Sequence, residues 1–496
     1  MSLVKIVALL FIFLYALPIM TVLCCLFPFL RHLCFAGMLY FTSNEYSLNI
    51  LPMPKRTGTA RGYAFTAVSF FAVPLLLSMC FSLQYKVRFF PPGTFFYFLY
   101  WLANILSGIN AAEMHPWGFE IYKMFWMYVT FLAAFNYLNN CKNLTFFVYL
   151  ICFILIVIFL VGLNQKYRIG RFQISSTFPH QNSLALYVEL AGLLVLGILM
   201  NERMSKILLL LTMIAFGGSV LLIIFTYSRG GLVVYFGGIA IVCALSILVN
   251  GFSLRRLTLM LLGMIVMLSV TGYALPRIIQ RFTKAPEQSK NTRIELAIGA
   301  KIIADEYRLG VGANHFSRYS GPASKRVPEQ TTELLKSKKQ DIGAIVETIY
   351  LLVAAECGWW GLGTLLLWFF YYYFSVIISV IALRKKPCSG FVIGLFGGLT
   401  CNYWHSTLEW SLKQNNNFAM QMILYALIGV IAVHRKDIRA AYKRQQEEKR
   451  VSRRKKRLFR PQLSFPAPET AGDADGGQLK DFRDSTRIEP EPLPQQ

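Results

Sequence analysis

Arg229 stands between two long apolar stretches, within the segment 226–231 (TYSRGG). A guanidinium in this position needs an anionic partner. For a lone arginine at the end of an apolar run, snorkelling or pairing with a nearby carboxylate is the commoner arrangement. The two glycines that follow Arg229 allow another group to approach the backbone closely. They favour a phosphate or a lipid headgroup as the partner.

A second arginine, Arg293, opens a helical pattern that leads into the segment LGVGANHF at 309–316. The pattern predicts a helix followed by a glycine turn. A Gly-x-Gly pair without a preceding strand is weak evidence for phosphate binding. His315, within this turn, is a candidate substrate-binding residue.

Glu347 begins an apolar segment in which Gly358 predicts a break between a short outer helix and a spanning helix. A carboxylate at a helix N-terminus can simply cap the helix, and that role is the commoner one. Beside basic groups at a water-filled mouth, it could equally accept a proton from a sugar hydroxyl. Burial would raise its pKa and neighbouring arginines would lower it, and the sequence leaves that balance open.

Five more polar residues at the ends of apolar runs are candidate substrate-binding residues: His180, Asn182, His405, Glu409 and Lys413. Each has an alternative role as a hydrogen-bonding residue at a membrane interface. The last three are spaced four residues apart, so on a helix they would form one polar stripe.

The elements that carry these residues have the composition of a membrane protein. Of the 496 residues, 55% are hydrophobic and 15% are charged, and the charges lie between the apolar runs. A helix needs about 20 apolar residues to cross a bilayer. Thirteen stretches meet this requirement, and one of them need not span: 4–23, 25–42, 63–83, 94–110, 120–139, 144–163, 183–200, 207–226, 230–249, 257–275, 358–383, 389–405 and 417–434. We therefore expect an all-α polytopic membrane protein with about 12 transmembrane helices and a large helical periplasmic loop.

Short basic loops predict which ends of the helices face the cytoplasm. Four such segments agree with one another: 201–206, 253–256, 384–386 and the tail from 434. The segments 164–182, 228–230, 276–346 and 405–417 then lie on the outer side. The first run is long and lacks a small-residue cleavage site, which favours a retained anchor over a cleaved signal peptide. The side of the N-terminus stays open.

The pattern divides the chain into five parts: transmembrane helices at 1–275, a large periplasmic loop at 276–346, further transmembrane helices at 347–434, a basic cytoplasmic segment at 435–460, and a tail at 461–496. The basic segment suits a solvated helix against anionic lipid headgroups. It has no aromatic or fold motif of a nucleic-acid binder. The tail is too polar to bury a core, so we expect it to be disordered.

Taken in order, these segments resemble the O-antigen ligase and O-antigen polymerase superfamily of bacterial inner-membrane glycosyltransferases. The resemblance covers roughly residues 60–435. It rests on FPHQN at 178–182, SRGG at 228–231, Arg293 before LGVGANHF, and YLLVAAECGWWGL at 350–362. Each motif is weak alone, whereas the ordered set around one long outer loop is fairly specific.

The resemblance implies an enzyme that moves a glycan from undecaprenyl diphosphate to an acceptor hydroxyl at the periplasmic face, without a metal or other cofactor. The acceptor could be a glycan, a lipid or a protein. The two functional arginines of such ligases match Arg229 and Arg293, which would stabilise the leaving diphosphate. The family's histidine does not carry over, because Glu347-Thr348 stands where the pattern has His-Asn. Glu347 is therefore the candidate base.

Two other classes of function are compatible with many helices. A transporter or a flippase for lipid-linked glycans would carry ionisable residues near helix midpoints and an internal repeat. Few such charges are evident, with Glu189 among the deepest, and no repeat is obvious. A noncatalytic scaffold would use the arginines only as anchors, but the large outer loop argues against it.

Overall fold

The computed structural model describes residues 3–53, 58–83, 85–140, 142–283, 287–324 and 344–458. The chain divides into two compact units, Met1–Lys443 and Arg444–Gln496. Part of the predicted periplasmic loop, at 325–343, and the predicted disordered tail at 461–496 lie outside the described residues.

Helices form most of the described structure, as predicted. They are α1 (Leu3–Phe11), α2 (Leu17–Leu26), α3 (Phe29–Tyr40), α4 (Ala67–Cys80), α5 (Thr94–Leu106), α6 (Met114–Leu138), α7 (Lys142–Leu163), α8 (Gln181–Asn201), α9 (Lys206–Thr226), α10 (Arg229–Asn250), α11 (Leu254–Thr283), α12 (Glu287–Glu306), α13 (Phe316–Ser324), α15 (Ile349–Ala382), α16 (Ser389–His405) and α17 (Asn415–Leu458). Short π or 3-10 turns are η1 (Ile12–Ala16), η2 (Ser107–Asn110), η3 (Asn164–Arg168) and η4 (Ser411–Lys413).

A small sheet departs from the all-α expectation. Strands β1 (Ser47–Ile50) and β2 (Tyr63–Thr66) pair in antiparallel register, with Ser47 opposite Thr66. The predicted helix at 63–83 therefore begins only at Ala67, because its first four residues belong to this hairpin.

Seven helices within the described residues are long and apolar enough to cross a membrane: Lys5–Leu26, Asn143–Arg168, Gln181–Asn201, Lys206–Thr226, Arg229–Asn250, Ile349–Ala382 and Asn415–Ser452. These agree with a multi-pass membrane protein. Helices α3, α4 and α5 have 12, 14 and 13 residues, which is shorter than their predicted runs. Helix α11 continues through Pro276 beyond the predicted run 257–275, because a proline removes one backbone hydrogen bond without always ending a helix.

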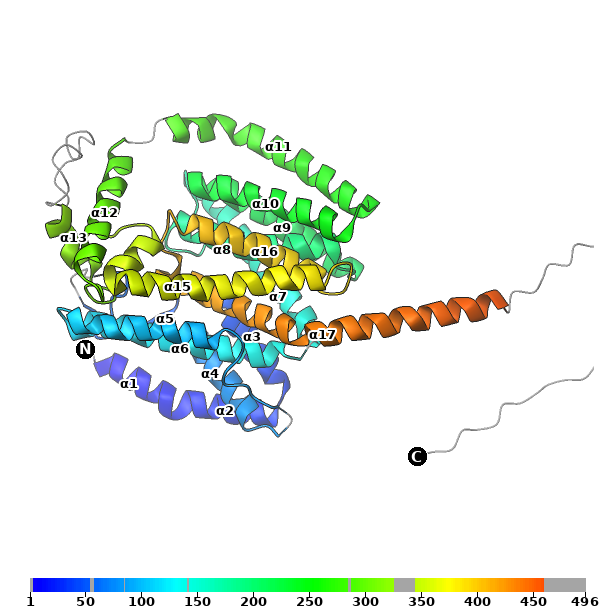
Figure 1. Cartoon of the computed structure of the whole chain (residues 1–496), viewed down its shortest axis with the longest axis horizontal. Helices are drawn as coiled ribbons and strands as arrows, with labels where there is room; N and C mark the ends of the chain where they lie inside the picture. Colours follow the sequence, from blue (N-terminus) through cyan, green and yellow to red (C-terminus); the bar gives the residue numbers. More distant parts are fainter. Residues whose placement is uncertain are drawn as a thin grey trace, which may run out of the picture. The chain divides into compact units, whose positions relative to one another are not determined.

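Helix α8 forms the centre of the bundle, with its whole length buried against α9, α10 and α16 (Figure 1). Glycines bring α8 and the antiparallel α16 together. A Cβ on Gly197 would lie 2.4 Å from the carbonyl oxygen of Gly390, and one on Gly394 would lie 2.7 Å from the Cα of Leu194. Small residues let the two backbones meet in this way.

Helix α15 is broken at Gly358, whose φ of 73° is left-handed, so the predicted glycine break is confirmed. The glycine turn after α12 packs into this break. The Val311 N–H donates to the Ala355 carbonyl at 3.1 Å, and a Cβ on Gly358 would lie 2.1 Å from the Arg308 carbonyl oxygen. This contact holds the turn and α12 against the start of α15.

Three of the predicted basic loops meet at one end of the bundle. The Arg255 guanidinium donates to the Glu202 carbonyl at 2.9 Å, which joins the loop after α8 to the start of α11. The Lys385 N–H donates to the Asn250 side chain at 2.8 Å, which joins the loop after α15 to the end of α10. Helices α8, α10 and α15 therefore all end on the same side.

Candidate functional site

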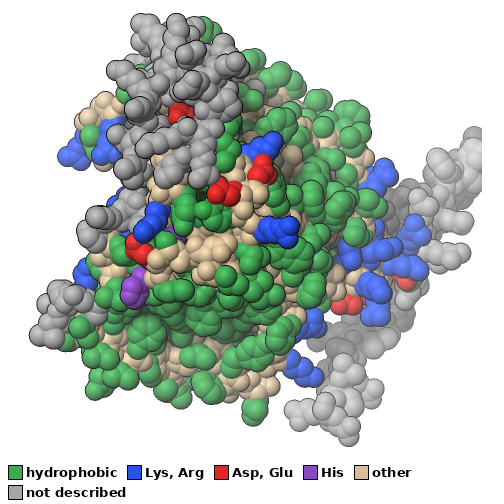
Figure 2. Space-filling view, turned by 60° about the vertical axis from the view of Figure 1, so that its left-hand side comes forward, with side chains coloured by type: hydrophobic (Ala, Val, Ile, Leu, Met, Phe, Trp, Pro, Cys, Tyr) green, Lys and Arg blue, Asp and Glu red, His purple; other side chains and the backbone are tan. Residues whose placement is uncertain are grey.

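A cavity of about 560 Å³ lies where α8, α10 and α15 begin, at the end of the bundle opposite the basic loops. Figure 2 shows this end of the molecule, where acidic and basic side chains lie close together within a largely hydrophobic surface. Among the residues that line the cavity are most of the predicted site residues: His180, Asn182, Arg229, Arg293, Glu347, His405 and Glu409.

The N-termini of two helices face the cavity. At the start of α8 the His180 imidazole accepts a hydrogen bond from the Asn182 N–H, and at the start of α10 the Ser228 hydroxyl accepts one from the Gly231 N–H. Unpaired N–H groups and the helix dipole favour anions at such ends. Burial and the charge of Arg293 lower the pKa of His180, which keeps its imidazole neutral at neutral pH.

The two arginines have different surroundings. Tyr227, with a left-handed φ of 48°, ends α9 and turns the chain so that Arg229 starts α10 at the cavity wall. No described carboxylate forms an ion pair with Arg229, whereas Arg293 is paired with Glu347. Burial raises the pKa of Glu347 above its usual value although Arg293 opposes it, which resolves the balance that the sequence left open. Arg229 is therefore the cation available to a ligand.

His405 is held by a carboxylate that the sequence did not connect with it. Its Nδ1 lies 2.7 Å from the Glu189 Oε1, and both side chains are buried. The close packing of α8 on α16 produces this pair. Its Nε2 faces the start of α10, where a Cβ on Gly230 would lie 3.2 Å away. No local pattern indicates this pairing, because the two residues are 216 positions apart.

Glu409 is the most strongly perturbed acid at the cavity. Its carboxylate accepts a hydrogen bond from the Asn182 amide. Burial raises the pKa of Glu409 to about 7, helped by Glu347, while His405, Asn182 and Arg293 act in the opposite direction. A carboxyl group that titrates near neutral pH can exchange protons during a reaction.

Two predicted substrate-binding residues do not line this cavity. His315 is fully buried, its Nδ1 donates to the Ala313 carbonyl at 2.9 Å, and its Nε2 accepts from the Glu113 N–H at 3.2 Å. It therefore closes the glycine turn. The expected polar stripe is not formed either, because α16 ends at His405 and Lys413 lies in η4.

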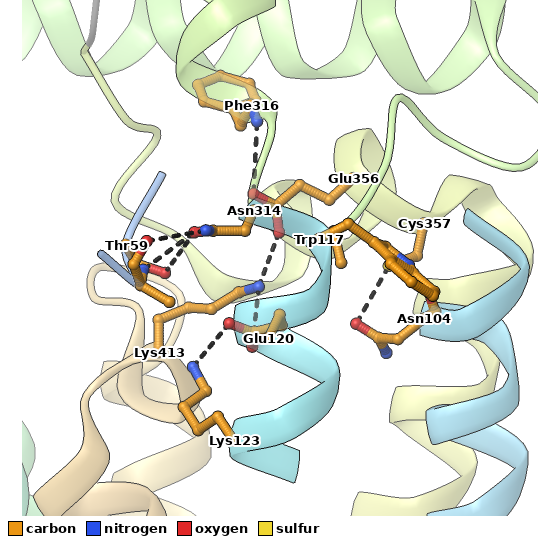
Figure 3. Close-up of polar contacts among 12 residues, drawn as sticks. Thr59, Asn104, Trp117, Glu120, Lys123, Asn314, Phe316, Glu356, Cys357 and Lys413 are labelled. Atoms are coloured by element: carbon orange, nitrogen blue, oxygen red, sulfur yellow. Dashed lines mark hydrogen bonds and ion pairs between the residues drawn. The ribbon is translucent and has the colours of Figure 1, made fainter. Parts of the chain in front are cut away.

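Lys413 instead joins a buried network of charges that the sequence analysis missed (Figure 3). Its Nζ lies 2.7 Å from the Glu356 Oε2 and 3.2 Å from the Glu120 Oε1, and Lys123 lies 2.8 Å from the other oxygen of Glu120. Burial alone would lower the pKa of Lys413, but Glu120 and Glu356 raise it well above its usual value. The network links η4 to α6 and α15.

Comparison of the sequence with models of known protein families and with curated proteins found no match. Within the described ranges, no group of three or more His, Cys, Asp or Glu residues is arranged to hold a metal ion. The cavity combines an arginine without a carboxylate partner among the described residues, helix N-termini, a second arginine and a carboxyl group whose pKa is about 7. This set can bind a dianionic group and take up a proton beside it.

Proposed function

We propose that this protein is a bacterial inner-membrane glycosyltransferase of the O-antigen ligase or polymerase type. It would transfer a glycan from undecaprenyl diphosphate to an acceptor hydroxyl at the periplasmic face. The observation that carries the proposal is Arg229, a cation without a described carboxylate partner at the start of α10, across the same cavity from Arg293. Two arginines at one cavity, one of them without a described carboxylate partner, suit a diphosphate.

The orientation follows from the two ends of the bundle. Basic loops stay in the cytoplasm, so the cavity at the opposite end would open to the periplasm. Shorter or more polar helices, α3 to α6, α11 and α16, would raise the seven to thirteen candidate spans, one of which need not cross the bilayer. The undecaprenyl chain would lie in the bilayer beside the bundle, with its diphosphate in the cavity.

In the proposed reaction, the acceptor hydroxyl oxygen forms a bond to the anomeric carbon of the donor sugar. The bond between that carbon and the diphosphate oxygen breaks, and its electron pair stays on the diphosphate. Arg229, Arg293 and the start of α10 would stabilise this developing charge. The leaving group is undecaprenyl diphosphate.

The hydroxyl proton must pass to a base, and the cavity offers two carboxyl groups. The sequence predicts Glu347 as the base. Its ion pair with Arg293 makes it better suited to positioning that arginine. Glu409, with a pKa near 7, matches the requirement for a base that works at neutral pH. We therefore propose Glu409 as the base that accepts this proton. The rates of release in Glu347→Gln and Glu409→Gln variants distinguish the two candidate bases.

The test uses the full chain in lipid nanodiscs, a synthetic undecaprenyl-diphosphate oligosaccharide, candidate acceptors and a chelator. Release of undecaprenyl diphosphate is measured. Arg229→Ala should slow release by about 100-fold to 1,000-fold, the loss typical of a removed oxyanion-stabilising group. The control is Arg318→Ala, because Arg318 is paired with Glu113 and does not line the cavity. Equal rates in Arg229→Ala and wild type would reject the proposal.

A transporter or lipid flippase remains the second candidate, and the buried network around Lys413 favours it, since ionisable residues inside a membrane bundle often belong to transport pathways. That function predicts movement of the labelled lipid across vesicles that contain the protein. Movement without any release of undecaprenyl diphosphate would support transport over transfer.

A further inference from the structure

A second cavity, of about 440 Å³, adjoins the first. The two share three lining residues, Pro179, Trp410 and Gln414. The second cavity lies between the β1–β2 hairpin, α6 and the segment that leads into α17. A molecule held there would lie beside the first cavity, next to these shared residues.

The lining of the second cavity is polar and aromatic but has balanced charge. Neutral groups include Asn49, Thr59 and Asn415, and Trp126 adds an aromatic ring. Its two lysines, Lys123 and Lys413, are neutralised by the buried Glu120 and Glu356 (Figure 3). The remaining described charged residues of the lining are one arginine, Arg61, and one glutamate, Glu45. This balance does not select for an anion or a cation.

Apart from the ion-paired Lys123 Nζ, two buried side-chain polar atoms of this lining have no hydrogen-bond partner among the described residues: the indole Nε1 of Trp126 and the side-chain oxygen of Asn49. The side-chain oxygen of Asn49 is buried and accepts no hydrogen bond from the described residues. A buried acceptor without a donor is unfavourable, so it points to a ligand that supplies one. Hydroxyl groups supply donors, and apolar faces of sugar rings pack on aromatic side chains such as Trp126.

We propose that the second cavity binds a neutral oligosaccharide, with Asn49 and Trp126 as its binding residues. The proposal rests on the proposed transferase function and adds a glycan-binding subsite to it. Two sources fit this chemistry: the acceptor glycan, or the sugars of the lipid-linked donor.

The probe is the lipid-free oligosaccharide released by mild acid from the synthetic donor, and its Kd is measured by calorimetry on the full chain in nanodiscs. Asn49→Leu removes the unpaired acceptor at similar volume, and Trp126→Leu removes the aromatic ring. Each should weaken binding by about fivefold to tenfold, the effect of one lost hydrogen bond or ring contact.

The matched control is Asn402→Leu, because Asn402 is also a buried asparagine without a partner among the described residues and lines neither cavity. Its Kd should equal that of wild type. Absence of probe binding to wild type, or equal Kd values for wild type, Asn49→Leu and Trp126→Leu, would overturn the proposal. Melting temperatures of all variants verify that the chains are folded.

Competition with intact donor identifies the source of the glycan. Displacement of the probe by the lipid-linked donor would assign the cavity to the donor's sugars, and simultaneous binding would assign it to the acceptor. Binding does not require transfer. Probe binding with the expected variant effects, combined with no release of undecaprenyl diphosphate, would therefore reject the proposed function and leave the glycan site standing.

Discussion

At the scale of single residues, two carboxyl groups at one cavity differ because their surroundings differ. The Glu347 side chain is 36% exposed and paired with Arg293, whereas Glu409 as a residue is 5% exposed and bonded to the neutral amide of Asn182. Burial disfavours the charged form of an acid, and an adjacent cation favours it. The same residue type can thus position an arginine at one place and exchange a proton at the other.

The raised pKa of Glu409 predicts a pH dependence. A base must be deprotonated, so the initial rate should rise with pH through about 7, where the Glu409 carboxyl loses its proton. Glu409→Gln should slow release of undecaprenyl diphosphate by about 100-fold to 10,000-fold and remove this rise. Initial rates between about pH 5.5 and 8.5 measure both effects. An unchanged profile in Glu409→Gln would exclude it as the base.

The buried ion pairs of Lys413 with Glu120 and Glu356 should contribute to the stability of the fold. Lys413→Met leaves Glu120 and Glu356 buried without their shared cation, which should destabilise the fold by about 3 to 5 kcal/mol. Thermal unfolding in detergent measures the loss. The control is Lys301→Met, because Lys301 is exposed on α12 and should change little. A double variant that adds Glu356→Gln should recover part of the lost stability, since it also removes an uncompensated charge.

At the scale of elements, the contact between α8 and α16 sets the distance from Glu189 to His405. Gly394 lies against the backbone of Leu194, so these helices can approach only where side chains are missing. At the break in α15, a missing side chain again allows close packing, because Gly358 leaves room for the turn after α12. Both contacts place residues from distant parts of the chain at one end of the bundle.

Gly394→Val should separate α8 from α16. The added side chain meets backbone atoms that cannot rotate away, so we expect a loss of about 1 to 3 kcal/mol in stability. The rate of release should also fall, because the imidazole of His405 moves. Gly237→Val is the control, since a Cβ at Gly237 meets no atom within 4 Å. Equal melting temperatures and rates in both variants would contradict this account.

At the scale of the whole molecule, the cavity and the basic loops lie at opposite ends of the helices, and the proposed orientation depends on this polarity. The outer end contains the loop after α16, with the exposed Thr407, and the inner end contains the loop after α15, with the exposed Arg384. A membrane between the two ends would separate them.

Cysteine labelling tests this orientation. In a background without native cysteines, Thr407→Cys should react with a membrane-impermeant maleimide in intact spheroplasts, because its loop would face the periplasm in the proposed orientation. Arg384→Cys should react only after the membrane is permeabilised. The reverse pattern would place the cavity in the cytoplasm and exclude a periplasmic transfer reaction.

The sequence alone determined the features that depend on neighbouring residues. The lengths of the apolar runs predicted the long helices, Gly358 predicted the break in α15, and polar residues at run ends included Arg229, Glu347 and Glu409. These predictions succeed because helix formation and membrane insertion depend on local composition. They are less accurate where a short hairpin replaces the first turn of an apolar run, as before α4.

Only the tertiary structure decided which polar groups meet. The pairs of Glu189 with His405 and of Glu120 with Lys413 join residues from distant helices, and His315 is enclosed by its own turn. The pKa of Glu409 likewise depends on how deeply the loop before η4 is buried. The physical reason is that a buried charge is stabilised by partners within a few ångströms. Those distances are set by helix packing, which no single segment of the sequence specifies.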